Sequence, residues 1–382
     1  MEVAYFDNAA TTYKKPEEMH RFMYEFYSAN SVNVGRGSHN LLSASNRIVR
    51  ETRNMLLDIF HANSEYETVF TPTATEAINI VLQGQDWQKN DVIYISPFEH
   101  NAVFRTVKYL EKKYGVEVIV LKNNTQSLEL DKDSILFQFA SKPPKFVVAT
   151  HVSNVCGNVI DIELLGEMVK QYNARYLIDC AQSAGLLETN ILKARADYMV
   201  FAGHKTLYGP FGCSGFICKK QSAPKPLIYG GTGVDSASEN MPEYLPTKYE
   251  AGSVNILSIA GLYKSLQWIN KIGINSIKEK EKENYNKLLS LINNYDFIKK
   301  VGTGTNNTSI LSCVFDGISS DNIGDIMSNN GVIVRTGLHC APLAHKTLGT
   351  FPEGTVRFSV SYFTNNEDFN RLKLALDIIE ES

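Results

Sequence analysis

The stretch from Tyr198 to Gly212, YMVFAGHKTLYGPFG, decides which fold this chain is expected to adopt. Its first four residues form a short apolar run that is typical of a buried strand. Lys205 follows this run, beside His204 and ahead of a glycine-rich turn. Ligands of open α/β sheets gather at the carboxyl ends of strands, and a desolvated lysine there can form a Schiff base with a carbonyl group. A lone lysine in a turn is usually a surface residue. The rest of the sequence has to decide whether Lys205 belongs to a binding site or to the surface.

The composition is that of a large globular protein. The chain has 382 residues, of which 43% are hydrophobic and 21% charged, so we expect two domains in one subunit. The net charge of -3 gives no overall attraction for nucleic acid or an anionic membrane. Residues 1–12 lack the features of a secretory signal, and apolar runs stay well short of the roughly 20 residues of a membrane helix. We therefore expect a cytoplasmic protein that binds neither nucleic acid nor membrane.

Short apolar segments alternate with helical stretches over residues 69–218. Strands are predicted at residues 69–71, 92–96, 116–121, 146–150, 176–179, 198–201 and 214–218. This alternation predicts an α/β fold with a seven-stranded, mainly parallel sheet that is covered by helices on both faces.

The pattern changes after this region. Residues 221–254 are predicted to form a long irregular loop, and loops of that length are usually functional or mobile. Helices at 255–272 and 276–294 follow. A smaller α+β domain is predicted from strands at 309–315, 332–335 and 356–359, a helix at 321–329 and a closing helix around 369–379. We therefore predict a large domain at 15–255 and a small domain formed by 1–14 and 256–382.

Polar residues recur just after the predicted strands. They are Glu99-His100-Asn101, His151-Val152-Ser153-Asn154, Asp179-Cys180-Ala181-Gln182 and His204-Lys205. Asp179 follows an apolar run, where burial of its carboxylate costs several kcal/mol unless it is paired. The helix that begins near Thr73 either has an ordinary threonine cap, which this segment alone favours, or binds an anion. An acid for a pyridinium nitrogen, a lysine for an aldehyde and a helix N-terminus for a phosphate together indicate a pyridoxal 5'-phosphate site.

Nine motifs in this order resemble those of the class V aminotransferase superfamily. They are DNAATT, FTPTATEAIN, SPFEHNA, HVSNVCGNVIDI, IDCAQSAG, FAGHKTLYGPFG, YEAGSVN, RTGLHCAP and GTVRFSVSYFTNNED. Within the superfamily the chain is similar to the cysteine desulfurases, in particular the SUF-type and selenocysteine-lyase-like branch. The resemblance runs from about Tyr5 to about Phe369. It implies fold type I of the pyridoxal enzymes and a homodimer with both active sites at the interface.

The resemblance also implies roles around the cofactor. Lys205 would form the Schiff base, Asp179 would keep the pyridine nitrogen protonated, and His100 would stack on the ring. The other implied contacts are Asn154 and Gln182 near the phenolic oxygen, Ala74, Thr75 and His204 near the phosphate, and Gly252 and Ser253 at the phosphate of the partner subunit. Two departures concern the phosphate: Ala202 stands where the family often has serine, and Thr73-Ala74 stands where it often has Gly-Thr.

Two residues are candidates for contact with the substrate: Arg357 and Cys340. The planar guanidinium of Arg357 could bind an α-carboxylate bidentately or could belong to a structural salt bridge. Cys340 lies in a turn-like stretch with basic neighbours, a setting that favours a reactive thiol, although any one cysteine is by default inert. The resemblance makes Cys340 the nucleophile and places Asn8 and Ala9 beside the substrate.

The same loop raises two further points. His339, Cys340 and His345 could suggest a metal, but a fourth ligand is missing from this stretch, so we predict none. Leu338 replaces a histidine that is common in the branch, and Leu343, directly after Cys-Ala-Pro, departs from the pattern of the branch. The chemistry of the loop and the choice of acceptor can therefore differ from those of the branch.

The predicted function is that of a cysteine desulfurase, which converts L-cysteine to L-alanine and holds the sulfur as a persulfide on Cys340. A protein sulfur acceptor would take this sulfur near residues 221–248, for sulfur mobilisation such as iron–sulfur cluster assembly. A selenocysteine lyase shares every residue named. Another aminotransferase or β-eliminating enzyme of the superfamily, in which Cys340 is incidental, is a second alternative. A third is a cofactor-free sulfur-relay scaffold, against which the presence of both Lys205 and Asp179 argues.

Overall fold

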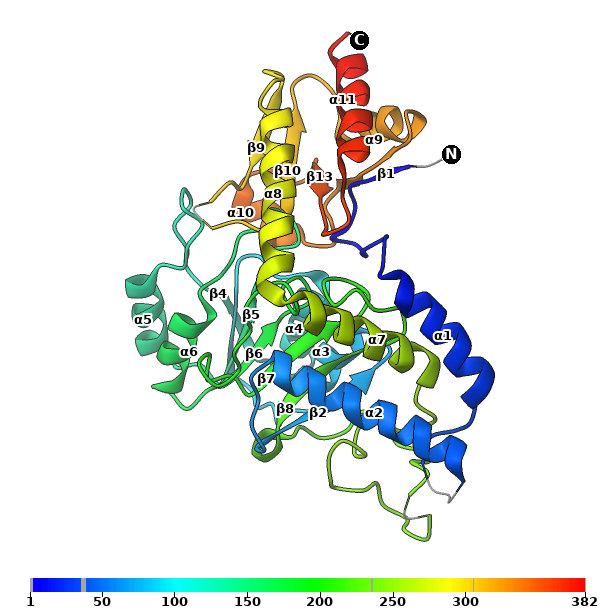
Figure 1. Ribbon diagram of the computed structural model, residues 1–382. Helices are drawn as coiled ribbons and strands as arrows, with labels where there is room; N and C mark the ends of the chain where they lie inside the picture. Colours follow the sequence, from blue (N-terminus) through cyan, green and yellow to red (C-terminus); the bar gives the residue numbers. More distant parts are fainter. Residues whose placement is uncertain (1–2, 36–38, 235, 305, 382) are drawn as a thin grey trace.

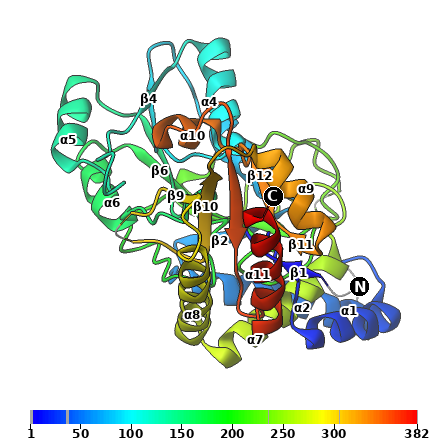
Figure 2. The ribbon, with the colours of Figure 1, turned by 90° about the horizontal axis from the view of Figure 1, so that it is seen from above.

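A computed structural model describes residues 3–35, 39–234, 236–304 and 306–381 of the chain. Its helices and strands form a larger part around a seven-stranded sheet and a smaller part around a four-stranded sheet (Figure 1). The long helix α8 (Ile274–Ile292) runs from one part to the other. Viewed from above, β10 (Ile310–Phe315), β13 (Thr355–Ser359) and α11 (Asn366–Glu380) lie in front of the larger part (Figure 2).

The seven-stranded sheet confirms the predicted count and its mainly parallel direction. Its strands are β2 (Tyr66–Thr71), β3 (Val92–Ile95), β4 (Glu117–Val120), β5 (Phe146–Thr150), β6 (Arg175–Asp179), β7 (Tyr198–Ala202) and β8 (Ser214–Lys219). They are ordered β2-β8-β7-β6-β5-β3-β4. β8 runs antiparallel to both of its neighbours, and the other adjacent pairs are parallel. β5, β6 and β7 therefore end at one edge, which is where Lys205 follows.

Helices cover both faces of this sheet. They are α1 (Glu17–Asn30), α2 (Asn40–Ile59), α3 (Ala74–Gln83), α4 (Asn101–Tyr114), α5 (Lys132–Ser141), α6 (Ile162–Lys170) and α7 (Ile256–Ile272). Successive strand residues point to opposite faces, so Ile178 packs in a cluster with Leu56 of α2 and Leu165 of α6. Its neighbour Leu177 packs in a second cluster with Val107 of α4. Burial on both faces explains why these strands are continuous apolar runs.

The smaller part is built across a long separation in the sequence. β1 (Ala4–Tyr5) pairs in parallel with β11 (Val332–Ile333). The four-stranded sheet is antiparallel, in the order β12 (Arg335–Gly337), β13, β10 and β9 (Ile298–Val301). The helices α9 (Ser320–Asn329) and α10 (Pro342–Leu348) complete it with α11. The core includes Phe6, Leu311, Phe358 and Leu376.

The expected strands and the two expected helices, α9 and α11, of the smaller part are present, with one difference. The strand predicted at 332–335 is divided into β11 and β12, which belong to different sheets. β9 escaped prediction because two exposed lysines follow Ile298, so it lacks a clear alternation. The domain boundary at 255 stays a prediction. In the structure α7, which follows this boundary, packs in the large cluster through Leu262 and Leu266.

Residues 221–254 form the long irregular segment that was expected. A short 3-10 helix, η1 (Lys220–Ser222), opens it, and the described residues from 223 to 254 contain neither helix nor strand. Tyr229 and Tyr244 are exposed on this segment. Among the helices that the structure describes, none is both long and apolar enough to cross a membrane.

Candidate active site

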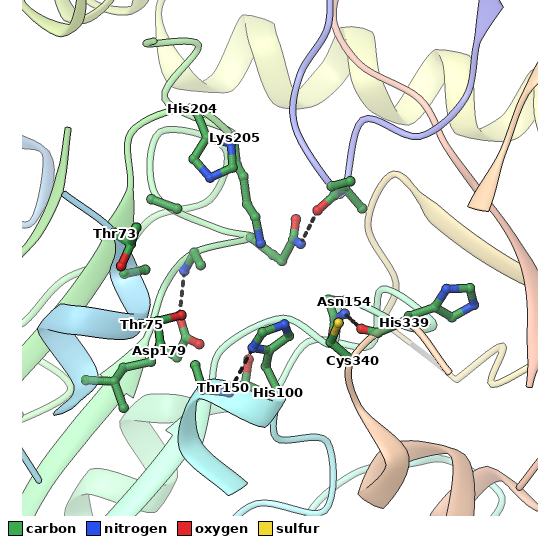
Figure 3. Close-up of a pocket in the computed structure, with 18 of the residues that line it drawn as sticks. Thr73, Thr75, His100, Thr150, Asn154, Asp179, His204, Lys205, His339 and Cys340 are labelled. Carbon is green, nitrogen blue, oxygen red and sulfur yellow. Dashed lines mark hydrogen bonds between the residues drawn. The ribbon is translucent and has the colours of Figure 1, made fainter. Parts of the chain in front are cut away.

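A cavity of about 330 Å³ lies between the two parts, at the carboxyl edge of the large sheet (Figure 3). Eleven of the fourteen residues predicted to contact cofactor or substrate line it: Ala9, Ala74, Thr75, His100, Asn154, Asp179, Gln182, His204, Lys205, Cys340 and Arg357. They come from the ends of β5, β6 and β7, the starts of α3 and α4, the N-terminal segment and the smaller part. Residues spread over most of the chain therefore meet in one site.

Lys205 stands in a turn that the N-terminal segment holds. The carbonyl of His204 accepts hydrogen bonds from the Thr12 N–H (3.2 Å), the Thr11 hydroxyl (3.0 Å) and Lys15 Nζ (3.1 Å). Gly203 is required because a Cβ atom there would lie 2.1 Å from the carbonyl oxygen of Cys213. Burial lowers the pKa of Lys205 to about 8, and Asp179 partly opposes this shift. An appreciable fraction of the side chain is therefore an uncharged amine near neutral pH.

Asp179 is a buried carboxyl group at the end of β6. Its side chain is 5% exposed, and Oδ1 accepts a hydrogen bond from the Ala181 N–H at 2.9 Å. Burial raises its pKa, while this hydrogen bond and Lys205 lower it. A buried carboxylate needs a cationic or donor partner. A protonated pyridine nitrogen in the cavity would be such a partner.

His100 is the N-cap of α4 and is held in one tautomer. Its Nδ1 accepts a hydrogen bond from the Ala102 N–H at 3.0 Å, so the proton of the neutral ring lies on Nε2. Burial, followed by the charges of Lys205, Arg357 and Arg105, lowers its pKa to about 4. The ring is therefore uncharged at neutral pH and suited to stack on an aromatic ligand.

Glu99, beside His100, fixes the start of α4 to the end of β5. Its Oε1 accepts hydrogen bonds from the Ser96 hydroxyl (2.6 Å) and the Thr150 N–H (2.7 Å). Burial raises the pKa of Glu99 to about 8. The sequence analysis placed Glu99 at this edge without a role. The available signal was an acid shortly after a predicted apolar strand.

The N-terminus of α3 opens onto the cavity. Thr73 caps the helix by accepting a hydrogen bond from the Glu76 N–H at 3.1 Å, so the cap favoured by the segment alone is present. Thr73, Ala74 and Thr75 also line the cavity, where the first N–H groups of the helix and its dipole favour an anion. Within the described part of the chain, Nδ1 of His204 is buried without a hydrogen-bond partner. These groups fit the phosphate of pyridoxal 5'-phosphate, as Lys205 and Asp179 fit its aldehyde and its ring nitrogen.

Arg357 lines the cavity and is also part of a buried salt bridge. It is 2% exposed, Nη2 lies 2.6 Å from Asp7 Oδ1, and Nη1 donates to the carbonyl of Asn154 at 2.8 Å. Within the described residues its Nε has no partner. The two roles considered for Arg357, salt bridge and ligand binding, are therefore compatible. Asp7 also contacts Arg335 (3.1 Å to Nε), a second cation on the cavity wall.

Sequence reasoning assigned no role to Asp7 or Arg335. Both stand in quoted motifs, but the burial of Asp7, which requires a cationic partner, is seen only in the structure. Asn8 lies behind the cavity, where its amide donates to the carbonyls of Ser359 (2.8 Å) and Tyr5 (3.1 Å). Ala9 faces the cavity, and its carbonyl accepts a hydrogen bond from Gln182 at 2.7 Å.

Cys340 differs from the other five cysteines. Cys156, Cys180, Cys213, Cys218 and Cys313 are buried free thiols, whereas Cys340 is exposed. It lies at the junction of the cavity with a second hollow of about 470 Å³, which extends along α3 and α4 past Asn79 and Arg105. A thiol in this place is open both to a ligand beside Lys205 and to a molecule from outside.

Gly252 and Ser253 lie apart from this cavity. They are exposed and line another hollow together with Pro72 and Glu76, on the outer side of the start of α3. Among the described residues, no group of three His, Cys, Asp or Glu side chains is placed to hold a metal ion.

Comparison with known proteins agrees with this geometry. Residues 4–372 match the family model Aminotransferase class-V, so the chain belongs to that family. A probable cysteine desulfurase of Methanothermobacter thermautotrophicus is 32% identical over 98% of this chain and 94% of its own. A probable cysteine desulfurase of Pyrococcus abyssi is 30% identical over 100% of this chain and 94% of its own.

Solved structures show the same fold. The apo cysteine desulfurase of Thermococcus onnurineus NA1 superposes with a TM-score of 0.89 at 29% identity, covering 99% of this chain and 94% of its own. The cysteine desulfurase CsdA of Escherichia coli superposes with a TM-score of 0.88 at 25% identity, covering 99% and 95%. These matches confirm the expected family and the expected α/β fold with a seven-stranded, mainly parallel sheet.

Proposed function

We propose that this protein is a cysteine desulfurase, which converts L-cysteine to L-alanine and keeps the sulfur as a persulfide on Cys340 for transfer to a sulfur acceptor. One observation carries the proposal: the exposed cysteine of the chain lies on the same cavity as Lys205 and Arg357. The cavity thus combines an amine, a carboxylate-binding guanidinium and a nucleophilic thiol. Similarity to cysteine desulfurases over nearly the whole chain supports the proposal.

Pyridoxal 5'-phosphate is the cofactor that the donor set fits and the family implies. When bound, it would supply an electron sink for negative charge at the α-carbon of an amino acid. Lys205 would hold its aldehyde carbon and Asp179 the proton of its ring nitrogen. The first turn of α3 and His204 would hold the phosphate, and His100 would stack on the ring.

The protein's own groups then divide the work on L-cysteine. Arg357 would bind the α-carboxylate, with Asp7 behind it keeping the guanidinium in place. Lys205, when its amine is free and uncharged, would remove the α-proton. The Cys340 thiolate would attack the substrate sulfur, so that an S–S bond forms and the Cβ–S bond breaks. The electron pair of the broken Cβ–S bond stays with the substrate carbons. Cβ then takes up a proton, which completes the methyl group of alanine.

A homodimer and a protein sulfur acceptor are further parts of the proposal. Gly252 and Ser253 are exposed beside the start of α3, a position from which they could reach the phosphate site of a second subunit. The acceptor would approach the open side of Cys340, along the hollow that extends over α3 and α4. We place the protein in the cytoplasm because all six cysteines are free thiols, as is usual in a reducing compartment.

The test is anaerobic incubation of the cofactor-loaded protein with L-cysteine, followed by assay of alanine and mass analysis of the Cys340 peptide. We expect alanine and a mass increase of one sulfur atom on that peptide. Cys340→Ala should lose both, whereas the matched control Cys218→Ala, at a buried cysteine of β8, should keep both. Absence of alanine, or undiminished sulfur release from Cys340→Ala, would contradict the proposal. Pyruvate and an amine form of the cofactor would indicate an aminotransferase or eliminating enzyme instead.

A further inference from the structure

The backbone at the nucleophile is held in an unusual conformation. His339 (φ 47°) and Cys340 (φ 56°) both lie in the left-handed region, although neither is glycine. Such residues persist only where the surroundings hold them in place. The structure around Cys340 therefore has to contain the contacts that fix this turn.

Three hydrogen bonds fix the main chain of the turn. Asn154 Nδ2 donates to the carbonyl of His339 at 2.7 Å, and the Asn101 N–H donates to the carbonyl of Cys340 at 2.7 Å. The Ala341 N–H donates to the carbonyl of Leu338 at 2.8 Å. The peptide groups on both sides of Cys340 are thus tied to the ends of the large sheet.

A fourth connection runs through the side chain of His339 into the small sheet. The Ser312 hydroxyl donates to the carbonyl of Val155 at 2.7 Å, and the Thr355 hydroxyl lies 3.0 Å from Ser312 Oγ. Thr355 Oγ1 also lies 2.8 Å from Nε2 of His339. The hydroxyls of Ser312 and Thr355 are buried, and His339 is 5% exposed.

The direction of the hydrogen bonds from Thr355 through Ser312 to Val155 fixes the tautomer of His339. A carbonyl only accepts, so the Ser312 proton goes to Val155, and Ser312 Oγ must accept the proton of Thr355. Thr355 Oγ1 has then no proton left for the imidazole and accepts from it. His339 therefore carries its proton on Nε2. Burial, followed by the charges of Arg357, His345 and Arg335, lowers its pKa to about 2, which agrees with a neutral ring.

We propose that Thr355 and Ser312 are positioning residues that hold His339 as the neutral Nε2–H tautomer and so keep the Cys340 turn in place for attack on the substrate sulfur. The His339 ring is turned away from the sulfur of Cys340 (Figure 3), so its role is to anchor the turn. This inference rests on the proposed desulfurase function. Cofactor binding, which depends on Lys205, Asp179 and α3, does not require it.

The decisive variant is Thr355→Val, which keeps the side-chain shape and removes the hydroxyl. We expect the cofactor-loaded variant to form alanine from L-cysteine about tenfold to a hundredfold more slowly, since small misplacements of a reacting group cost this much. The cofactor's visible absorption and the KM for L-cysteine should be unchanged. Thr355→Ser, which keeps the hydroxyl, should restore the rate, and Ser312→Ala should lower it in the same direction.

L-selenocysteine supplies an internal control. Its carbon–selenium bond is weaker and its selenium a better leaving group, so we expect its cleavage to proceed without an attacking thiol. Thr355→Val should therefore retain its rate on L-selenocysteine. Thr52→Val is the matched control, because it removes another buried threonine hydroxyl, which donates to Ile48 at 2.7 Å in α2. This control should retain both rates.

The tautomer is checked separately by ¹⁵N resonances of the histidine side chains in the cofactor-loaded protein, with the His339 signal assigned by its loss in His339→Gln. We expect protonation at Nε2 in the wild type. A proton on Nδ1, a normal L-cysteine rate in Thr355→Val, or failure of Thr355→Ser to restore that rate would overturn the inference. Loss of both the L-cysteine and L-selenocysteine rates would mark a merely structural role and overturn it too. A wild type that forms no alanine would overturn the proposed function, and with it this role.

Discussion

The two reactive side chains of the cavity are supported in different ways. Lys205 follows β7, and its partner Asp179 ends the adjacent strand β6, so the parallel sheet itself brings them together. Cys340 stands in a left-handed turn that is held by contacts between segments far apart in the chain, such as Asn154 with His339. The pairing of Lys205 with Asp179 is therefore set by two adjacent strands, and the N-terminal segment holds the Lys205 turn. The Cys340 turn depends on long-range contacts for its position. The following experiments test this difference, from the largest expected effect to the smallest.

Lys205→Ala should remove the visible absorption of the cofactor complex and lower alanine formation on the order of a thousandfold or more, because the group that holds the aldehyde is lost. Absorption spectra and an alanine assay measure both effects. Lys15→Met is the matched control: burial also lowers the pKa of Lys15 to about 8, and its Nζ donates to the carbonyl beside Lys205. This control should keep the absorption, and a loss equal to that of Lys205→Ala would contradict the assignment.

Asp7→Asn tests the long-range side. It removes the carboxylate that faces the buried Arg357, and an unpaired buried charge costs about 3 kcal/mol or more of stability. Urea unfolding monitored by circular dichroism measures the loss. Asp316→Asn, which breaks the exposed pair with Lys299, should cost less than about 1 kcal/mol. Equal losses in the two variants would show that the Asp7 pair does not hold the smaller part in place.

The rate at which the cofactor-free protein captures pyridoxal 5'-phosphate should rise with pH. Only the uncharged amine reacts, and burial places the pKa of Lys205 at about 8 instead of 10.5. We expect a rise of about tenfold between pH 7 and pH 9, followed by a plateau. Asp179→Asn should shift the curve to lower pH, since that carboxylate favours the ammonium form. A midpoint near the ordinary value of 10.5 would contradict a desolvated lysine.

Glu281→Gln tests the join between the two parts. Glu281, on α8, accepts a hydrogen bond from Tyr208 at 2.6 Å, and burial raises its pKa from 4.5 to about 7. The folded protein thus holds a proton that the unfolded chain releases between these values, so this group's contribution to stability falls as pH rises through that interval. The variant should gain on the order of 1 kcal/mol at pH 8 and less at pH 6.

Thermal or urea unfolding at the two pH values measures this gain. The control Glu283→Gln changes an exposed acid of the same helix, which pairs with Lys280 and Lys287. It should show no gain at pH 8. A stability difference for Glu281→Gln that did not change with pH would contradict the raised pKa.

Much of the large sheet could be predicted because its strands are apolar runs buried on both faces. Each run carries its signal within a few residues, as Tyr176-Leu177-Ile178 before Asp179 does. β9 carried too little of that signal, with two exposed lysines after Ile298. Asp7 and Arg335 could be read as parts of motifs, but their pairing depends on a contact across 328 positions. No local pattern encodes such a contact.

The sequence by itself determined the strands of the large sheet, the lysine after β7 and the acid after β6, because hydrophobic periodicity acts over a few neighbouring residues. Only the tertiary structure decided that Arg357 forms an ion pair with Asp7 and that Asn8 donates to the backbone carbonyl of Ser359. It also decided that Cys340 is the exposed thiol. These outcomes depend on which distant segments exclude water from one another. Burial and the pairing of buried charges are properties of the assembled chain.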